Sequence, residues 1–212
     1  MADQSLNPDV DYILTNGERL VTVTTRCAFS LGTSDGLNDL LLVPDEPDAE
    51  WRQPIAVMHR DAVMMAALRL TALLDRDLKI VSFQAVYHLL KNPDVVKLLL
   101  KELEARHGSD DNPPSRADLI NDYLATYSEI DWKVHGRLTH FRNRGIAHLT
   151  IEKMQKSVTL PELRTLADIL ARLAATLQHL CQTGTAFHVD IRERYQDLAR
   201  RIMKNHRANL AG

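Results

Sequence analysis

The chain has 212 residues, of which 45% are apolar and 25% charged, and its formal net charge at pH 7 is −2. This composition is ordinary for a globular protein, and the length suits one domain with a proper hydrophobic core. Few glycines (8), prolines (8) and aromatic residues (5%) argue against an all-β fold and against disorder, and the slightly acidic balance argues against a general nucleic-acid coat.

The chain has no apolar run of the roughly 18 residues that a membrane-spanning helix needs. Its first residues, MADQSLNPDVD, are acidic and unlike a signal peptide. Cys27 and Cys181 lie in amphipathic segments without metal-ligand spacing, so we expect both to be buried, reduced thiols. We expect a cytoplasmic protein that makes no membrane contact.

Helical periodicity dominates the chain. A weaker helix interrupted by Gly17 is expected over 9–31, and 45–48 reads as a polar loop. Residues 56–74 are apolar nearly all round, which predicts a central buried helix. Arg69 lies in that helix, and a buried arginine is costly unless it is paired. We favour an acidic partner for Arg69; the alternative is that it approaches a functional cavity and supports the site.

Ser82 and the step Asn92-Pro93-Asp94 predict the starts of two further helices, the second ending near residue 106. Residues 108–114, GSDDNPP, form the clearest loop. Ser115 and Asp118 then form a capping box ahead of one long helix that ends at Gly145.

Thr159 and Glu162 form another capping box, before a leucine stripe that stops at Gly184. A last, arginine-rich helix is expected over 189–205; it either contacts phosphate or is a solvated helix. Together these elements predict an all-α bundle of about five to seven helices. We expect a single domain over 1–212, with its core at about 10–184.

The segment Arg142–His148, RNRGIAH, is the most informative part of the chain. It places a permanently charged guanidinium and a titratable imidazole on either side of Gly145. Phosphodiester cleavage needs a fixed cation for the phosphate and a group that transfers protons near neutral pH. Arg142 and His148 are therefore candidate catalytic residues.

Spacing alone is weak support, because five Arg and His pairs in this chain are separated by four to six residues. Arg142 and His148 differ from the other pairs because Asn143 follows the arginine, a glycine lies between them, and a helix is expected to end there. The amide of Asn143 can orient an imidazole or a phosphate oxygen.

The expected break at Gly145 has a geometric consequence. In an unbroken helix, residues six apart point about 240° apart around the axis, so a break would let Arg142 and His148 converge on one ligand. If the helix continues, Arg144 and His148 share a face instead.

Lys133, Arg137, His140 and Arg144 form a basic stripe at helical spacing. We favour a solvated face; the alternative is a surface covered by RNA or a partner subunit, where Lys133, Arg137 and Arg144 would bind nucleic acid. The histidines at 135, 140 and 148 lack metal-ligand spacing, and we predict neither a metal site nor a cofactor.

Arg142-Asn143 and His148, at the end of a predicted helix in a bundle, resemble the R-(polar)-x(n)-H signature of the HEPN superfamily. The wording FRNRGIAH is similar to the abortive-infection AbiU-type branch. The segment LRLTALLD, which ends at Asp75 and precedes Ser82-Phe83, is similar to the central helix of that branch. The resemblance covers about residues 10–180.

This resemblance implies an HEPN-like helical domain that dimerises and, in many members, is a metal-independent ribonuclease of phage defence or toxin–antitoxin systems, with an antitoxin as a further partner. Arg142, Asn143 and His148 match the motif, whereas Arg144 lies in its variable stretch. His148 would accept the 2′-hydroxyl proton of RNA or donate one to the leaving 5′-oxygen, and Arg142 would stabilise the phosphorane. One histidine cannot easily serve both roles, so we expect a homodimer with a composite site.

Two other interpretations stay open. In the first, the domain is an HEPN-like module that binds a nucleotide or a partner without cleaving RNA. In the second, Arg142 caps helix carbonyls or pairs with an acid, and His148 only starts a helix. The second predicts that His148→Ala lowers stability and changes no ligand behaviour.

Overall fold

The computed structural model describes residues 6–42, 50–109, 114–143, 158–182 and 190–210, with side chains to 202 in the last range. These ranges contain eight helices and no strand, which confirms the all-α bundle with one helix more than the upper end of our range. The helices are α1 (Pro8–Leu41), α2 (Arg52–Leu73), α3 (Phe83–Leu90), α4 (Pro93–His107), α5 (Arg116–Ser128), α6 (Trp132–Phe141), α7 (Leu160–Cys181) and α8 (Ile191–Leu210).

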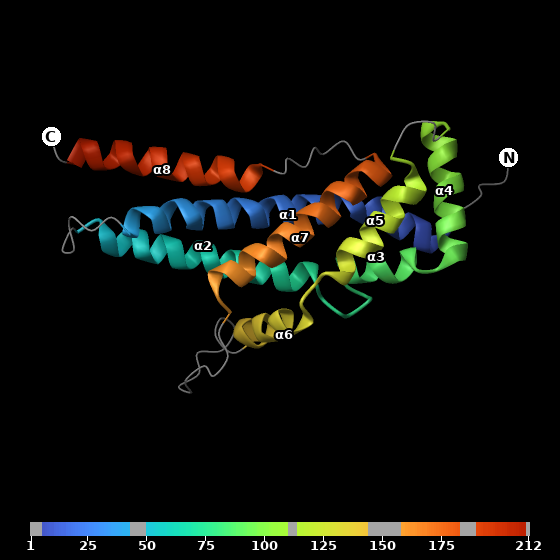
Figure 1. The fold of residues 1–212 in the computed structure, drawn as a ribbon, viewed down its shortest axis with the longest axis horizontal. Coiled ribbons are helices and arrows are strands. Elements are labelled where there is room, and N and C mark those ends of the chain that lie inside the picture. The colour runs from blue at the N-terminus through green and yellow to red at the C-terminus, as the bar shows by residue number, and fades with distance from the viewer. Residues whose placement is uncertain (1–5, 43–49, 110–113, 144–157, 183–189, 211–212) are drawn as a thin grey trace.

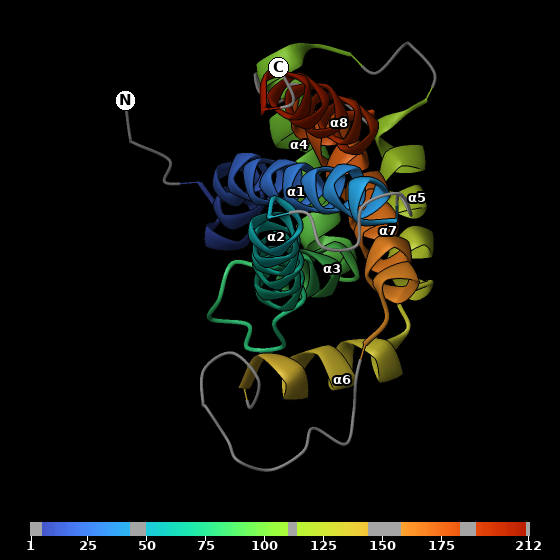
Figure 2. The same ribbon diagram turned by 90° about the vertical axis from the view of Figure 1, so that its left-hand side faces the viewer.

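Helix α1 is the axis of the molecule. It packs against α2, α7 and α8, and in Figure 1 α2 and α8 run along opposite sides of it while α7 crosses obliquely. The end-on view of Figure 2 places α1 between α8 and α2. Gly17 does not interrupt α1, which continues to Leu41, ten residues beyond our predicted end at Leu31. Tertiary contacts on several faces explain why a segment of weak helical pattern stays helical.

Two glycines let α8 lie directly on α1. A Cβ atom at Gly32 would lie 2.2 Å from the carbonyl oxygen of Arg192, and one at Gly36 would lie 2.5 Å from that of Gln196. Only a residue without a side chain permits this approach of two helix backbones. Near Gly32, Phe29 and Tyr195 add an edge-to-face ring contact with centroids 4.1 Å apart.

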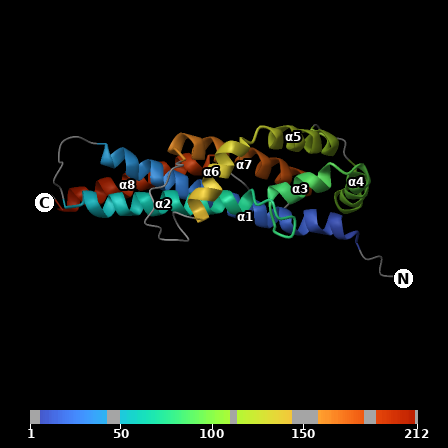
Figure 3. The ribbon, with the colours of Figure 1, turned by 90° about the horizontal axis from the view of Figure 1, so that it is seen from below.

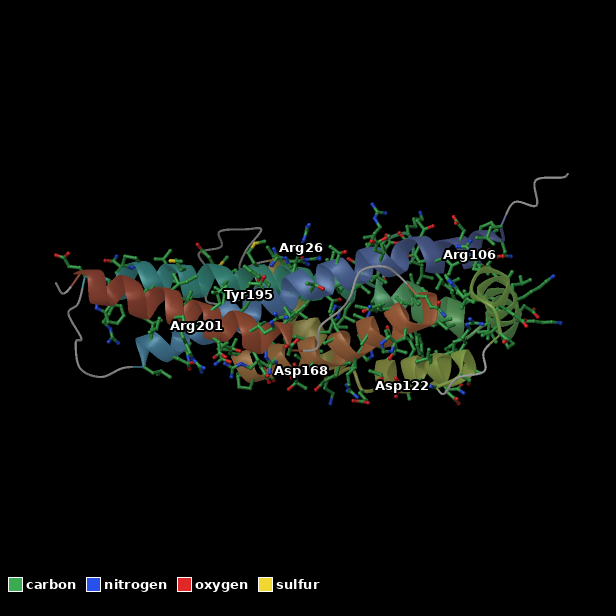
Figure 4. The ribbon with its side chains drawn as sticks, turned by 90° about the horizontal axis from the view of Figure 1, so that it is seen from above. Arg26, Arg106, Asp122, Asp168, Tyr195 and Arg201 are labelled. Atoms are coloured by element: carbon green, nitrogen blue, oxygen red, sulfur yellow. The ribbon has the colours of Figure 1, made fainter. Side chains whose placement is uncertain are left out.

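Two arginines of α8 pair with acidic residues of other helices. Arg192 pairs with Asp168 of α7 at 2.6 Å, and Arg200 pairs with Asp39 of α1 at 2.5 Å. In the view from above in Figure 4, Tyr195 and Arg201 lie along α8 and Asp168 lies on the neighbouring α7. The basic character of α8 therefore serves, at these two positions, to attach it to acidic residues of the bundle.

Local capping signals set several helix starts as predicted. The side chains of Ser82 and Asn92 accept hydrogen bonds from backbone N–H groups at the starts of α3 and α4. Ser115 and Thr159 form complete capping boxes with Asp118 and Glu162. The helix α7 ends at Cys181, where Gln182 adopts a left-handed conformation with φ 48°; Gly184, where we placed its end, lies outside the described residues.

The predicted single helix from Ser115 to Gly145 was wrong. The chain stops α5 at Ser128 and starts α6 at Trp132, because the carboxylate of Asp131 accepts hydrogen bonds from the N–H groups of Lys133 and Val134. The apolar spacing continues across the break, since Ile130 and Val134 are both buried. In Figure 1, α6 lies below α2 and α7 and does not continue the line of α5.

The core follows the length of an elongated molecule (Figure 3). Its members come from α1 to α7, and a smaller cluster of Leu37, Leu40 and Ile55 lies near the ends of α1 and α2. Both cysteines are buried, as expected, and burial raises the pKa of Cys27 and of Cys181 to about 12. Among the described helices, none is a candidate for crossing a membrane.

Candidate functional site

Arg142 is the C-cap residue of α6, and its side chain is held at two points. Its Nε donates a hydrogen bond to Oδ1 of Asn143 at 2.9 Å. Its Nη1 lies 4.0 Å from a carboxylate oxygen of Asp75, just beyond the end of α2. Arg142 and Asn143, both predicted site residues, are thus joined by a hydrogen bond, and the amide oxygen points towards the guanidinium. The pairing of Arg142 with Asp75 agrees with the alternative interpretation in which Arg142 has a structural role and pairs with an acid.

Arg142 also lines a cavity of about 440 Å³, which we call the Arg142 hollow. This volume lies within the range of small-molecule sites. The hollow lies between the end of α2 and one face of α6, and its lining residues are Thr71, Asp75, Arg76, Trp132, His135, Gly136, Thr139 and Arg142. The lining therefore includes two arginines, one aspartate, two threonines and one histidine.

His135 is the most unusual group in the hollow. The residue is only 6% exposed, yet its Nε2 has no hydrogen-bond partner among the described residues. Buried polar groups are normally satisfied, so this nitrogen is a local exception. The atom is itself buried and is not exposed to the hollow. Burial lowers the pKa of His135, Arg76 and Arg142 lower it further, and Asp75 opposes them. A lowered pKa favours the neutral imidazole near pH 7.

A second cavity of about 300 Å³, the tyrosine hollow, adjoins the first. Its lining residues are Arg76, Gln84, Tyr87, His88, Tyr127, Ser128 and Trp132, so the two hollows share Arg76 and Trp132. The rings of Tyr87 and Tyr127 stack with centroids 4.0 Å apart. The guanidinium of Arg76 lies over the ring of Trp132, 4.8 Å from its centroid.

None of the other predicted site residues that the structure describes lines either hollow. His148 and Arg144 lie outside the described residues. On α6, Lys133 is exposed, whereas Arg137 forms an ion pair with Glu162 of α7. Arg69 lines neither hollow: its Nη1 donates to the carbonyl of Arg26 at 3.0 Å and to the hydroxyl of Ser30, both on α1. It meets a hydroxyl and a carbonyl there, not the acidic partner that we favoured.

Sequence reasoning missed several groups of the hollows, among them Arg76, Tyr87, Tyr127, Trp132 and His135. His135 was considered only as a metal ligand, and among the described residues no cluster of His, Cys, Asp or Glu suits a metal. A signal was available in the spacing, because Trp132, His135 and Thr139 lie on one face of a helix. That face forms a site only because the end of α2 packs beside it and encloses the hollow.

Comparison with protein-family models, curated proteins and solved structures gave no match. The resemblance to the HEPN superfamily accordingly rests on its motif residues alone. Of these, Arg142 and Asn143 fall within the described part of the chain.

Proposed function

We propose that this protein is a metal-independent endoribonuclease of the HEPN type, acting as a toxin or in phage defence. The observation that supports the proposal best is the position of Arg142. Arg142 lines a cavity whose wall also contains His135, and its guanidinium is hydrogen-bonded to the matched Asn143, the next residue in the chain. A fixed cation beside a hollow is what a charged phosphorane requires.

The reaction uses the nucleophile that RNA carries. The 2′-oxygen attacks phosphorus as its proton passes to an imidazole, and the bond to the 5′-oxygen breaks as that oxygen receives a proton. The products are a 2′,3′-cyclic phosphate and a 5′-hydroxyl. His148 transfers the protons and Arg142 stabilises the phosphorane. Asn143 holds Arg142 through Nε, so the Nη groups would bind the phosphate oxygens, with Nη1 also lying 4.0 Å from Asp75.

Two proton-transfer roles favour a homodimer in which each protomer supplies one His148. The outer surface of α2 supports this part of the proposal. Three large apolar side chains are exposed there, Val57 (49%), Met58 (51%) and Met65 (43%). An apolar patch on a surface helix is typical of a contact between subunits. An antitoxin protein is a further partner of a toxin of this kind.

Purified protein incubated with single-stranded RNA and tRNA in EDTA tests the activity. We expect cleavage by the wild type, with a 2′,3′-cyclic phosphate end, and none by His148→Ala at unchanged thermal stability. Cleavage by that variant at the wild-type rate would remove the mechanism.

A matched pair at Gly136 tests whether the hollow is the site. A Cβ atom there meets nothing within 4 Å, so both substitutions fit the fold. Gly136→Leu should fill the hollow and abolish cleavage, and Gly136→Ala should preserve it. Equal rates for the two variants would place the reaction elsewhere.

The second candidate is a non-catalytic nucleotide-binding module. The tyrosine hollow favours it, because aromatic and cationic side chains meet there without a general base being required. This candidate predicts saturable nucleotide binding with no cyclic-phosphate product at any protein concentration.

A further inference from the structure

The tyrosine hollow has the chemistry of a site for a flat aromatic ligand. Tyr87 and Tyr127 stack at an interplanar angle of 19°, and Trp132 lies against Tyr127 with centroids 5.7 Å apart. These three rings come from α3, α5 and α6, so packing between helices fixes their positions. Nucleobases bind such surfaces because every base offers a face for stacking.

Hydrogen bonds hold the polar edge of the same hollow. The hydroxyl of Tyr127 donates to Oε1 of Gln84 at 2.6 Å, and Nε2 of Gln84 lies 2.9 Å from Nε2 of His88. His88 and Ser128 are exposed at the rim. A base lying on the rings would therefore present its edge to fixed amide, imidazole and hydroxyl groups, which can accept or donate hydrogen bonds.

Two cations lie close to the aromatic rings of the tyrosine hollow. Arg76 is exposed, covers Trp132, and belongs to both hollows. On the other side, Nζ of Lys91 lies 5.5 Å from the ring centroid of Tyr87. Arg142 faces the first hollow only. The aromatic surface is therefore flanked by cations, an arrangement typical of single-stranded nucleic-acid sites.

His135 lies next to Trp132 in the wall of the Arg142 hollow. Its ring contacts Trp132 edge to face, with centroids 5.3 Å apart, and it lines the Arg142 hollow but not the tyrosine hollow. Its Nε2 is buried, so the imidazole helps to position Trp132 by packing.

We infer that the two hollows together bind one nucleoside phosphate unit, with the base on the rings of the tyrosine hollow and the phosphate beside Arg142 in the adjoining hollow. Arg76 and Trp132 form the junction at which the ribose lies. The inference deepens the proposed function, on which it rests, by assigning a base subsite next to the reacting phosphate. The ligand is a nucleotide of RNA or a free nucleotide, which share this chemistry.

Trp132 offers a direct readout. The chain has two tryptophans, and Trp51 lies in the small cluster near the ends of α1 and α2, so Trp51→Phe leaves Trp132 as the single reporter. Titration of this protein with AMP and UMP should quench its fluorescence. Ribose 5-phosphate and inorganic phosphate lack the base, so their affinity should be lower by about ten-fold or more. Neither should change the fluorescence.

Substitution of Tyr87 tests the rings. Tyr87→Leu keeps an apolar side chain and removes the ring, so nucleotide affinity should fall about ten-fold while phosphate affinity is retained. Tyr87→Phe should bind as the wild type does. Tyr195→Leu is the matched control, because it removes the aromatic ring of Tyr195 on α8 from its contact with Phe29 on α1 and should leave nucleotide affinity unchanged.

The outcomes separate this inference from the proposed function. Equal affinity for AMP and ribose 5-phosphate, or wild-type affinity in a folded Tyr87→Leu protein, overturns the base subsite and leaves a ribonuclease possible. Base-dependent quenching without RNA cleavage by the wild type upholds the subsite and overturns the ribonuclease. A 2′-deoxy dinucleotide that binds more tightly than AMP assigns the site to a nucleic-acid strand, and equal binding assigns it to a free nucleotide.

Discussion

Arg142 at the end of α6 lies 4.0 Å from the carboxylate of Asp75 at the end of α2. The two side chains are 32% and 25% exposed, so solvent screens their attraction and the pair stabilises the fold by about 1 kcal/mol or less. The carboxylate has a stronger effect on ligands, because it occupies the hollow that an anion would enter and partly neutralises the arginine there.

Asp75→Asn should therefore increase the affinity for inorganic phosphate several-fold, since a negative charge leaves the hollow while a hydrogen-bonding group of the same shape remains. Isothermal titration at low ionic strength measures the change, and the difference should shrink as salt is added. The control is Asp168→Asn, which removes a carboxylate that is paired with Arg192 and does not line the hollow. Weaker phosphate binding by Asp75→Asn would mean that Asp75 positions Arg142 for the ligand.

The lowered pKa of His135 makes stability depend on pH. Burial disfavours the imidazolium, so between the lowered pKa and the ordinary value of 6.5 the unfolded chain binds more protons than the folded one. The free energy of unfolding should consequently fall as pH drops through 6.5 towards that lowered pKa, and His135→Gln should flatten this dependence. Urea unfolding from about pH 8 to about pH 5 covers the window.

His59 must be accounted for in that measurement, because burial lowers its pKa as well and Asp35 opposes the shift. His59→Gln should leave the contribution of His135 in place. If wild type and His135→Gln lose stability equally over the window, His135 is not held neutral by its surroundings.

Arg69 should prove important for stability and not for ligands. Its guanidinium ties α2 to α1 through the carbonyl of Arg26 and the hydroxyl of Ser30. Arg69→Met keeps the apolar stem and removes both hydrogen bonds, which should lower the free energy of unfolding by about 1–2 kcal/mol. Denaturant unfolding checks this, with Ser30→Ala expected to lose less. A loss of phosphate affinity at unchanged stability would instead show that Arg69 supports the functional site.

Gly32→Ala should detach α8. In the middle of a helix this substitution normally stabilises by about 0.5–1 kcal/mol, but here the new Cβ would lie 2.2 Å from the carbonyl oxygen of Arg192. The amides of α8 should then exchange hydrogen faster, while those of α2 keep their protection. Gly136→Ala is the matched control, because nothing lies within 4 Å of its Cβ. Unchanged protection of α8 would show that its docking tolerates a larger separation.

The predictions that the structure confirms depend on interactions between residues close together in the sequence. The caps at Ser82, Asn92, Ser115 and Thr159 bond to N–H groups two or three residues away, so the sequence alone specifies them. The leucine stripe of α7 and the burial of both cysteines follow from local periodicity. The pairing of Arg142 with Asn143 likewise joins neighbours.

Long-range packing decided the rest. Gly17 predicts a break when read locally, yet the helix continues there because α7 packs over it. The unbroken apolar spacing concealed the stop at Ser128, although Asp131 caps a new helix. Asp75 and Arg142 meet only because α2 ends where α6 ends. The residue type determines which hydrogen bonds a side chain can form, but the packing of the surrounding helices determines which cavity it lines.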